Sequence, residues 1–222
     1  MSVSFLLAAG LESILIIGGS HLATPTHLTT PLHDGLQAKG VQVHTIGVCG
    51  SNPGDWLKVT QGTCGGLERV GEAKATLTGN KATTQPIAEL IAREKPSLVM
   101  VVISDNMAGY TNPTFPEAWA WRQVTGLTKA IAATNTPCVW VGPAWGTEGG
   151  KFKKTFARAQ RVSTFLSNNV APCAYIDSLQ FSKPGEWATT DGQHLTVAGY
   201  KLWADALLKQ LETMPEFAKA AK

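Results

Sequence analysis

Ser13-Ile-Leu-Ile-Ile-Gly-Gly-Ser-His21 begins with a short, uninterrupted apolar run that two glycines stop. A run of this kind is typical of a strand that is buried on both faces. Four later runs have the same character: residues 41–48, 97–103, 138–141 and 173–176. Segments with helical periodicity of apolar residues lie between or after these runs: residues 31–39, 86–94, 116–134, 152–166 and 196–211. Strands and helices are therefore expected to alternate along the chain.

This alternation predicts right-handed βαβ units, and so an α/β protein with three αβα layers around a five-stranded parallel sheet. Residues 51–85 do not fit the alternation, because they are rich in Gly and Thr and too long for an ordinary loop. We expect an insertion there, at the carboxyl end of the second strand, with a small hairpin that turns at Gly79-Asn80. The predicted organisation is a lead-in over residues 1–12, a single domain over 13–213 and a tail over 214–222.

Composition and charge exclude several classes of protein. Of the 222 residues, 44% are hydrophobic and 16% charged, which is enough to bury a large core and argues against extensive disorder. The net charge is +3 and the basic residues are scattered, so nucleic-acid binding is not expected. No apolar run approaches the roughly 18 to 20 residues of a membrane-spanning helix.

Neither a metal nor a cofactor is expected. His27, His33 and His44 are dispersed and form no zinc-binding motif, and the sequence has no glycine-rich nucleotide-binding motif. His27 and His33 are interpreted as surface or loop residues, and His44 as a satisfied residue of the second strand.

The four cysteines, Cys49, Cys64, Cys138 and Cys173, match neither a CxxC redox motif nor a zinc knuckle. Their even number permits two disulfides, and buried free thiols are the alternative. A Cys49–Cys64 pair would close a loop of about 15 residues, which stabilises by about 3 kcal/mol in the chain-entropy model and requires an oxidising compartment. Possible disulfides favour a periplasmic or secreted location, while a cytoplasmic one stays open.

Two polar elements have a spacing suited to acyl chemistry. Ser20 follows the first strand directly, at the sheet edge where a tight turn can point backbone N–H groups at a developing oxyanion. Asp191-Gly-Gln-His194 stands just before the last helix. A spacing of three brings both side chains to one side of a turn, so the carboxylate can accept from Nδ1–H and leave Nε2 to take a proton from a serine.

Two further elements are expected at the same edge of the sheet. Asn106 follows the third strand, where its amide can face the crevice, and Gly50 follows the second strand, where glycine permits close approach of a backbone N–H to a ligand. Each residue taken alone is more often structural than catalytic. Four such elements at the carboxyl edge of one sheet coincide rarely by chance.

Serine, glycine, asparagine and D-x-x-H in this order resemble the four sequence blocks of the SGNH, or GDSL-type, hydrolase superfamily. The resemblance runs from Ile14 to Leu211 and is strongest in the last block, Asp191-Gly-Gln-His-Leu-Thr-Val-Ala-Gly-Tyr200. It implies a flavodoxin-like sheet with five parallel strands in the order 2-1-3-4-5.

The resemblance also implies roles for individual residues. Ser20 would be the nucleophile, His194 the general base and acid, and Asp191 the residue that orients it. The oxyanion hole would comprise the N–H of Ser20, the N–H of Gly50 and the side-chain amide of Asn106.

The chain departs from the family pattern in the first and third blocks. Gly18-Gly19-Ser20 stands where the family usually has G-D-S, and Ser104-Asp105-Asn106-Met107 stands where it usually has G-x-N-D. Gly47 and Gly54 lie close enough to Gly50 to be alternatives for the second block. His21 after the serine is similar to the G-D-S-H form of SGNH domains attached to acyltransferases of cell-surface polysaccharides.

Three tryptophans, Trp56, Trp145 and Trp187, fall in predicted loops around the same sheet edge. Their faces could stack on sugar rings, with loop packing as the alternative, and His21 is counted with them as a predicted substrate contact. The sequence therefore predicts a serine esterase that removes acetyl or other short acyl groups from a carbohydrate through an acyl-enzyme, with a small-molecule or polysaccharide acyl ester as its substrate. An O-acetyltransferase acting on a polysaccharide and a non-catalytic carbohydrate-binding protein are the alternatives.

Overall fold

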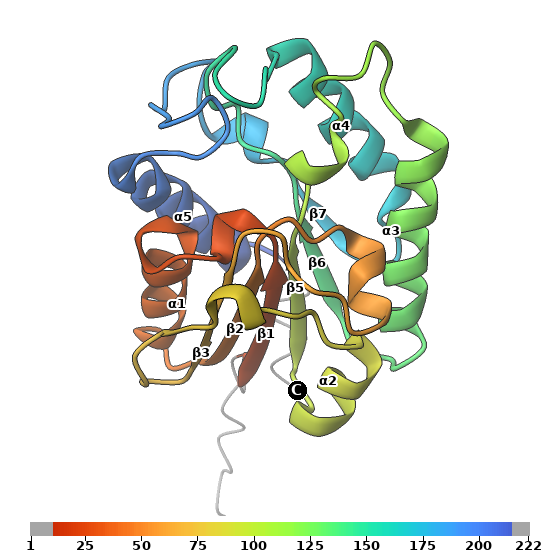
Figure 1. Ribbon diagram of the computed structural model, residues 1–222. Coiled ribbons are helices and arrows are strands. Elements are labelled where there is room, and N and C mark those ends of the chain that lie inside the picture. The colour runs from red at the N-terminus through yellow and green to blue at the C-terminus, as the bar shows by residue number, and fades with distance from the viewer. Residues whose placement is uncertain (1–10, 215–222) are drawn as a thin grey trace, which may run out of the picture.

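The computed structural model describes residues 11–214, which form one mixed sheet with helices on both faces (Figure 1). The predicted lead-in, residues 1–12, and the predicted tail, residues 214–222, lie outside the described residues except for residues 11, 12 and 214. The sheet contains seven strands: β1 (Ser13–Gly18), β2 (Gln42–Val48), β3 (Gly66–Val70), β4 (Thr76–Leu77), β5 (Leu98–Val102), β6 (Cys138–Val141) and β7 (Ala174–Ile176). Their order across the sheet is β4-β3-β2-β1-β5-β6-β7.

The prediction of an α/β fold is confirmed, but the prediction of a sheet with only five strands, all parallel, is wrong, because the sheet has seven strands. Within this longer sheet the five predicted strands are neighbours in the order 2-1-3-4-5. The five predicted runs correspond to β1, β2, β5, β6 and β7, which pair in parallel. The other two strands, β3 and β4, come from the 51–85 stretch and extend the sheet beyond β2 in antiparallel pairing. They lack an apolar run because they lie at the edge of the sheet, where most of their residues stay partly or fully exposed.

The hairpin within the 51–85 stretch is also placed differently from the prediction. Its turn lies between Val70, the last residue of β3, and Thr76, the first of β4. Gly79 and Asn80, the predicted turn, instead form part of a short 3-10 helix, Gly79–Lys81.

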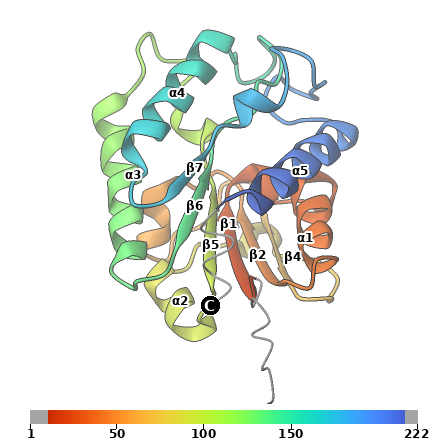
Figure 2. The same cartoon turned by 180° about the vertical axis from the view of Figure 1, so that it is seen from behind.

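Helices cover the two faces of the sheet unequally, as the two opposite views show (Figures 1 and 2). One face carries α1 (Thr30–Gln37) and α5 (Val197–Glu212). The other carries α2 (Ile87–Glu94), α3 (Glu117–Ala132) and α4 (Phe156–Asn169). No helix in residues 11–214 has both the length and the apolar character needed to cross a membrane.

Alternate residues of β1 belong to two separate apolar cores, one on each face. Ile14 and Ile16 pack with residues of α1 and α5, whereas Leu15 and Ile17 pack with residues of α2, α3 and α4. All four are almost completely buried. Because side chains of a strand alternate between faces, a strand covered on both faces must be apolar throughout, which is why this run was recognisable in the sequence.

The parallel register brings the carboxyl ends of β1, β2 and β5 together. Gly18 lies beside Gly47 on one side and beside Val102 on the other. An added Cβ at Gly47 would lie 2.3 Å from the backbone of Leu22, so this glycine allows the turn after β1 to pack directly on β2. The loops that leave these three strands therefore meet at one edge.

Candidate active site

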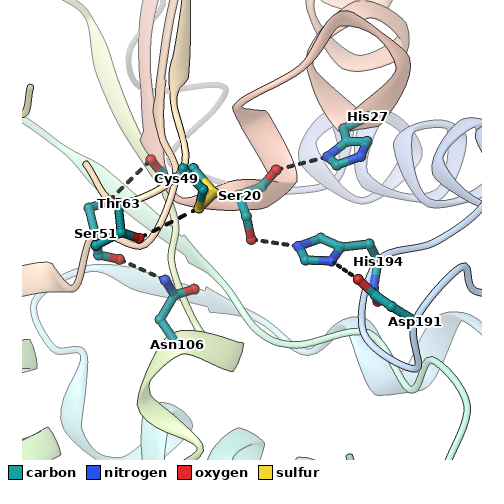
Figure 3. Close-up of a disulfide and its surroundings, with 10 residues drawn as sticks. Ser20, His27, Cys49, Ser51, Thr63, Asn106, Asp191 and His194 are labelled. Carbon is teal, nitrogen blue, oxygen red and sulfur yellow. Dashed lines mark hydrogen bonds and ion pairs between the residues drawn. A yellow bond between two sulfur atoms is a disulfide. The ribbon is translucent and has the colours of Figure 1, made fainter. Parts of the chain in front are cut away.

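Ser20, His194 and Asp191 form a continuous hydrogen-bonded chain at this edge (Figure 3). Ser20 begins a single 3-10 turn directly after β1, and its Oγ lies 2.7 Å from His194 Nε2. His194 Nδ1 lies 2.7 Å from Asp191 Oδ2. With the Nδ1–H donating to the carboxylate, Nε2 is the acceptor for the serine hydroxyl, which is the arrangement of a general base and a nucleophile.

The loop that carries Asp191 and His194 is held by its own backbone. Asp191 Oδ1 accepts hydrogen bonds from the N–H groups of Gln193, at 3.0 Å, and His194, at 2.7 Å. Burial opposes ionisation of Asp191, but the backbone and imidazole hydrogen bonds from His194 outweigh it and lower the pKa of the carboxyl. Asp191 is therefore a carboxylate at neutral pH and can stabilise an imidazolium at His194.

Hydrogen-bond donors lie on the other side of Ser20. Within residues 11–214, neither the Ser20 N–H nor the Gly50 N–H has a hydrogen-bond partner. Asn106, in a 3-10 turn after β5, donates one N–H of its amide to the Ser51 carbonyl at 2.9 Å, which leaves the second N–H of the same nitrogen. Gly50 has φ +84°, a conformation that favours glycine. These three groups resemble the donor set of an oxyanion hole.

The structure distinguishes Gly50 from the two neighbouring glycines. Gly50 lines the cleft beside Ser20. Gly47 lies within β2 against the backbone of Leu22, and Gly54 packs against the side chain of Gln123. Of the three glycines, Gly50 is therefore the one that lines the cleft together with Ser20.

An open cleft of about 500 Å³ surrounds these groups, within the range of small-molecule sites. We call it the active-site cleft. It is lined by Ser20, Cys49, Gly50, Thr63, Cys64, Asp105, Asn106, Gly109, Tyr110, Thr111, Lys151, Phe152, Asp191, Gln193 and His194.

Over 215 residues the chain is 40% identical to Protein BcsX of Komagataeibacter xylinus, a match that covers 96% of this chain and 80% of BcsX. The chain belongs to the BcsX family. No protein-family model matches the sequence.

Solved structures show that this BcsX-family chain has the fold of SGNH hydrolases. A GDSL-like lipase from Bacteroides thetaiotaomicron is 13% identical with a TM-score of 0.55, covering 90% of this chain and 86% of the lipase. A peptidoglycan O-acetylesterase is 11% identical with a TM-score of 0.56, covering 96% of this chain and 93% of the esterase. At these identities the likeness is one of fold.

None of the three predicted tryptophan contacts of the BcsX-family chain lines the active-site cleft. Trp56 is fully buried and donates its Nε1–H to Ser51 Oγ, and Trp187 is 7% exposed in the core beside α5. Trp145 donates its Nε1–H to the Leu179 carbonyl and packs edge-on against Phe156. Burial of Trp56 and Trp187 contradicts their assignment as sugar contacts and supports the alternative, loop packing. Trp145 is partly exposed but lies outside the cleft. Loop position alone does not reveal which side of a loop faces solvent.

His21 is likewise not a contact for substrate, because it is 2% exposed and points into the protein. Its Nδ1 lies 2.8 Å from the Tyr200 hydroxyl and its Nε2 lies 3.2 Å from Asp105 Oδ2. Burial lowers the pKa of His21 to about 4 despite the hydrogen bond to Asp105. His21 is therefore neutral at physiological pH.

A buried ion pair beneath the cleft was missed by the sequence analysis. Lys154 Nζ lies 2.8 Å from Asp105 Oδ1, and both side chains are at most 1% exposed. Tyr110 also donates its hydroxyl to Asp105 Oδ1. Burial opposes ionisation of Asp105, but Lys154 and then His21 outweigh it and hold the pKa of the carboxyl well below its usual range. The partners are far apart in the chain, so no local pattern could have indicated them.

His27, expected as a surface or loop residue, also lies beside Ser20 and His194 (Figure 3). Its Nδ1–H donates to the Ser20 carbonyl at 2.8 Å. Its ring stacks on that of His194, with 5.5 Å between centroids and 22° between planes. His27 thus fixes the backbone of Ser20 and covers one face of the His194 imidazole. His33 was also expected to be a surface or loop residue, but its side chain is buried.

The cysteines form two disulfides, Cys49–Cys64 and Cys138–Cys173. The first lines the active-site cleft. The second joins the starts of β6 and β7, at the opposite ends of these strands from the cleft. Within residues 11–214, no group of three or more His, Cys, Asp or Glu side chains is arranged to hold a metal ion.

Proposed function

We propose that this chain is a serine esterase that removes acetyl or other short acyl groups from a carbohydrate through an acyl-enzyme. The observation that carries the proposal is the hydrogen-bonded chain from Asp191 through His194 to Ser20. Ser20 opens into a cleft that also contains Gly50 and Asn106. The SGNH fold supports the proposal at the level of a hydrolase.

Acylation begins when Ser20 Oγ attacks the ester carbonyl carbon while His194 Nε2 takes the hydroxyl proton. The carbonyl oxygen becomes an oxyanion that accepts hydrogen bonds from the N–H groups of Ser20 and Gly50 and from the Asn106 amide. The tetrahedral intermediate then expels the alcohol of the sugar, which takes the proton from His194, and leaves acyl-Ser20.

Deacylation repeats these steps with water as the nucleophile. His194 Nε2 removes a proton from the water, the resulting hydroxide attacks the acyl carbon, and the carboxylic acid leaves as Ser20 Oγ regains the proton. Asp191 keeps the Nδ1–H of His194 in place and stabilises the imidazolium in both halves of the reaction.

The groups beneath the cleft do not oppose charge development on His194. The rings of His21 and His194 are 5.2 Å apart between centroids, so a protonated His21 would oppose formation of the imidazolium. The low pKa of His21 keeps it neutral, and the charges of Asp105 and Lys154 offset each other. Ser20 and His194 therefore act beside a buried group with little net charge.

The walls of the cleft fit a carbohydrate ester better than a long acyl chain. Phe152 lies edge-on to His194, with 5.4 Å between ring centroids, and Tyr110 gives a second aromatic wall. Thr111, Lys151 and Gln193 add polar groups to the same cleft. A sugar presents both apolar C–H faces and hydroxyls, so it complements this mixture. The fold-level likeness to a peptidoglycan O-acetylesterase agrees with this substrate class.

The two disulfides support a periplasmic or secreted location, since such bonds persist in oxidising compartments.

The test compares wild type, Ser20→Ala and a control variant, Ser167→Ala, at an exposed serine of α4. We expect wild type and Ser167→Ala to release p-nitrophenol from p-nitrophenyl acetate and acetate from acetylated oligosaccharides, and Ser20→Ala to do neither above background. A serine-reactive phosphonate should add its mass to Ser20 alone. Equal rates in folded wild type and Ser20→Ala, with no label, would refute the esterase and favour a non-catalytic binding protein.

Adding unacetylated oligosaccharide to the same reaction separates hydrolysis from transfer. A hydrolase releases free acetate whether or not the acceptor is present. An O-acetyltransferase, which would form the same acyl-Ser20, passes the acetyl group to a sugar hydroxyl, so acetylated acceptor would accumulate at the expense of free acetate.

A further inference from the structure

The Cys49–Cys64 disulfide lies beside the proposed oxyanion hole rather than in a remote part of the fold (Figure 3). Cys49 directly follows β2, and Cys64 lies two residues before β3 begins. Both cysteines line the active-site cleft together with Ser20 and His194. The disulfide thus forms part of the wall in which the proposed ester carbonyl would sit.

Two of the three proposed oxyanion donors depend on the turn formed by residues 49–51, which we call the oxyanion turn. Gly50 contributes its own N–H. Asn106 is tied to the turn because its amide donates to the Ser51 carbonyl at 2.9 Å, and this contact sets the direction of the remaining N–H on the same nitrogen. A displacement of the oxyanion turn would therefore move both donors away from the carbonyl oxygen.

Few contacts other than the disulfide hold the oxyanion turn against the loop that precedes β3. The Cys49 N–H donates to the Gly65 carbonyl and the Thr63 N–H donates to the Cys49 carbonyl, each at 2.9 Å. Thr63 Oγ1 occupies the space that a Cβ on Gly50 would need, 2.1 Å away. The same loop is tied to the following segment at Gly62, whose N–H donates to the Ala82 carbonyl at 2.8 Å. Thr63 and Cys64 are themselves exposed, so the part of the loop that contacts the oxyanion turn has little side-chain packing of its own.

We propose that the Cys49–Cys64 disulfide is a positioning element for the oxyanion hole, so that the esterase rate depends on this bond being oxidised. The inference rests on the proposed function and adds a redox requirement to it. The cysteines do not touch the reacting atoms. They act through the Gly50 N–H and the Asn106 amide, whose alignment governs stabilisation of the tetrahedral intermediate.

The expected effect is on kcat. Loss of one oxyanion donor costs about 100-fold to 1000-fold in kcat. Opening the disulfide would misalign two donors without removing them, so we expect a fall in kcat of about 10-fold to 100-fold. KM should change by less than about threefold, because these donors bind the oxyanion of the transition state more strongly than the ester of the ground state.

The second disulfide provides a matched control. Cys138→Ser/Cys173→Ser also removes one disulfide, and it opens a longer loop, with a sequence separation of 35 against 15. The control should therefore lose at least as much thermal stability as Cys49→Ser/Cys64→Ser. It should nevertheless keep its kcat within about twofold of wild type, because neither of its cysteines lies at the cleft.

The experiment measures kcat and KM with p-nitrophenyl acetate, and the rate of Ser20 labelling by a p-nitrophenyl phosphonate, for wild type and both double variants. The phosphonate adduct is tetrahedral and places its polarised phosphoryl oxygen in the oxyanion position, so its formation reports on the donors. We expect Cys49→Ser/Cys64→Ser to be slow in both assays and the control to be normal. Equal kcat in wild type and both variants, or an equal fall in the two variants, would overturn the inference.

Selective reduction of the wild type tests, without a substitution, whether kcat depends on the Cys49–Cys64 disulfide. This experiment also tests the inference if the Cys49→Ser/Cys64→Ser variant does not fold. Cys64 is exposed and Cys49 half-buried, whereas Cys138 and Cys173 are 4% and 6% exposed. A water-soluble phosphine should therefore reach the first disulfide before the second. The phosphine becomes a phosphine oxide with oxygen from water, and the disulfide takes up two electrons and two protons to give two thiols.

We expect kcat to fall as the Cys49 and Cys64 thiols become available to alkylation, and to return when the folded protein is reoxidised. Unchanged kcat with both thiols reduced would overturn the inference while leaving the esterase intact. A wild type that shows no Ser20-dependent turnover would instead refute the proposed function.

Discussion

Replacing Lys154 by methionine should destabilise the fold because it strands a buried negative charge. Lys154 Nζ contacts Asp105 Oδ1 and the Ala144 carbonyl, each at 2.8 Å, in a site without solvent access. Methionine fills much of the same volume but has no charge. Asp105 would keep its contacts with His21 and Tyr110 but lose Lys154, its one cationic partner among residues 11–214.

The magnitude follows from the burial of both groups. Removing one partner of a buried ion pair costs about 3 to 5 kcal/mol of unfolding free energy, because the remaining charge is uncompensated. Replacing both partners is far milder, so Asp105→Asn/Lys154→Met should recover most of the loss. The coupling between the two sites should therefore be large and favourable, as expected for groups in direct contact.

Urea unfolding at several pH values is the assay. In wild type the pKa of Asp105 is lowered, so its contribution to stability is present above the unfolded pKa of about 3.9 and is lost as pH falls below it. In Lys154→Met, burial should raise that pKa instead, so the folded variant gains relative stability as Asp105 is protonated. The deficit of the variant should shrink from pH 7 towards pH 4. A loss below 1 kcal/mol at pH 7, or no rescue in the double variant, would refute this reasoning.

Three further predictions concern the cleft and the far end of the sheet. Asn106→Ala should lower kcat by about 100-fold to 1000-fold with little change in KM, and full activity in p-nitrophenyl acetate hydrolysis would remove Asn106 from the oxyanion hole. Asp191→Asn should lower kcat by about 10⁴-fold while leaving the fold intact by circular dichroism, because the Nδ1–H of His194 loses its acceptor; a fall of less than tenfold would contradict that role. Burial opposes protonation of His44, but Glu94 and then Glu68 outweigh it and raise its pKa. The stabilisation of the fold by protonated His44 is therefore complete below the pKa of histidine in the unfolded chain, about 6.5. It is lost as pH rises through the higher pKa of His44 in the folded protein. In urea unfolding, the loss of unfolding free energy in His44→Gln relative to wild type should thus be greatest near pH 6 and smaller above pH 8. A loss that does not vary with pH would contradict this role of His44.

The strands that could be predicted from the sequence are those whose pattern depends on residues close together in the chain. The apolar run of β1 was recognisable because a strand covered on both faces needs apolar side chains at every position. The hairpin of β3 and β4 was expected in the 51–85 stretch but was misplaced, and its pairing with β2 was not expected. An edge hairpin can be formed by polar residues, provided that β2 offers unpaired backbone groups for pairing.

The same distinction applies to the side chains of the cleft. Asp191 and His194 are three residues apart in one loop, and their hydrogen bond was expected from that spacing. Trp56 and His21 were assigned to the surface of the cleft and are buried instead, because residue type and loop position do not specify the direction of a side chain.

The sequence alone determined the alternation of strands and helices and the order in which Ser20, Gly50, Asn106 and the Asp191–His194 loop follow the strands. Local periodicity and short spacings suffice for these features, since they depend on neighbours within a few residues. Only the tertiary structure decided that Lys154 neutralises Asp105 beneath the cleft and that Cys49 pairs with Cys64 beside it. A buried charge is stable only with its partner in contact, and which distant residue provides that contact depends on how the whole chain packs.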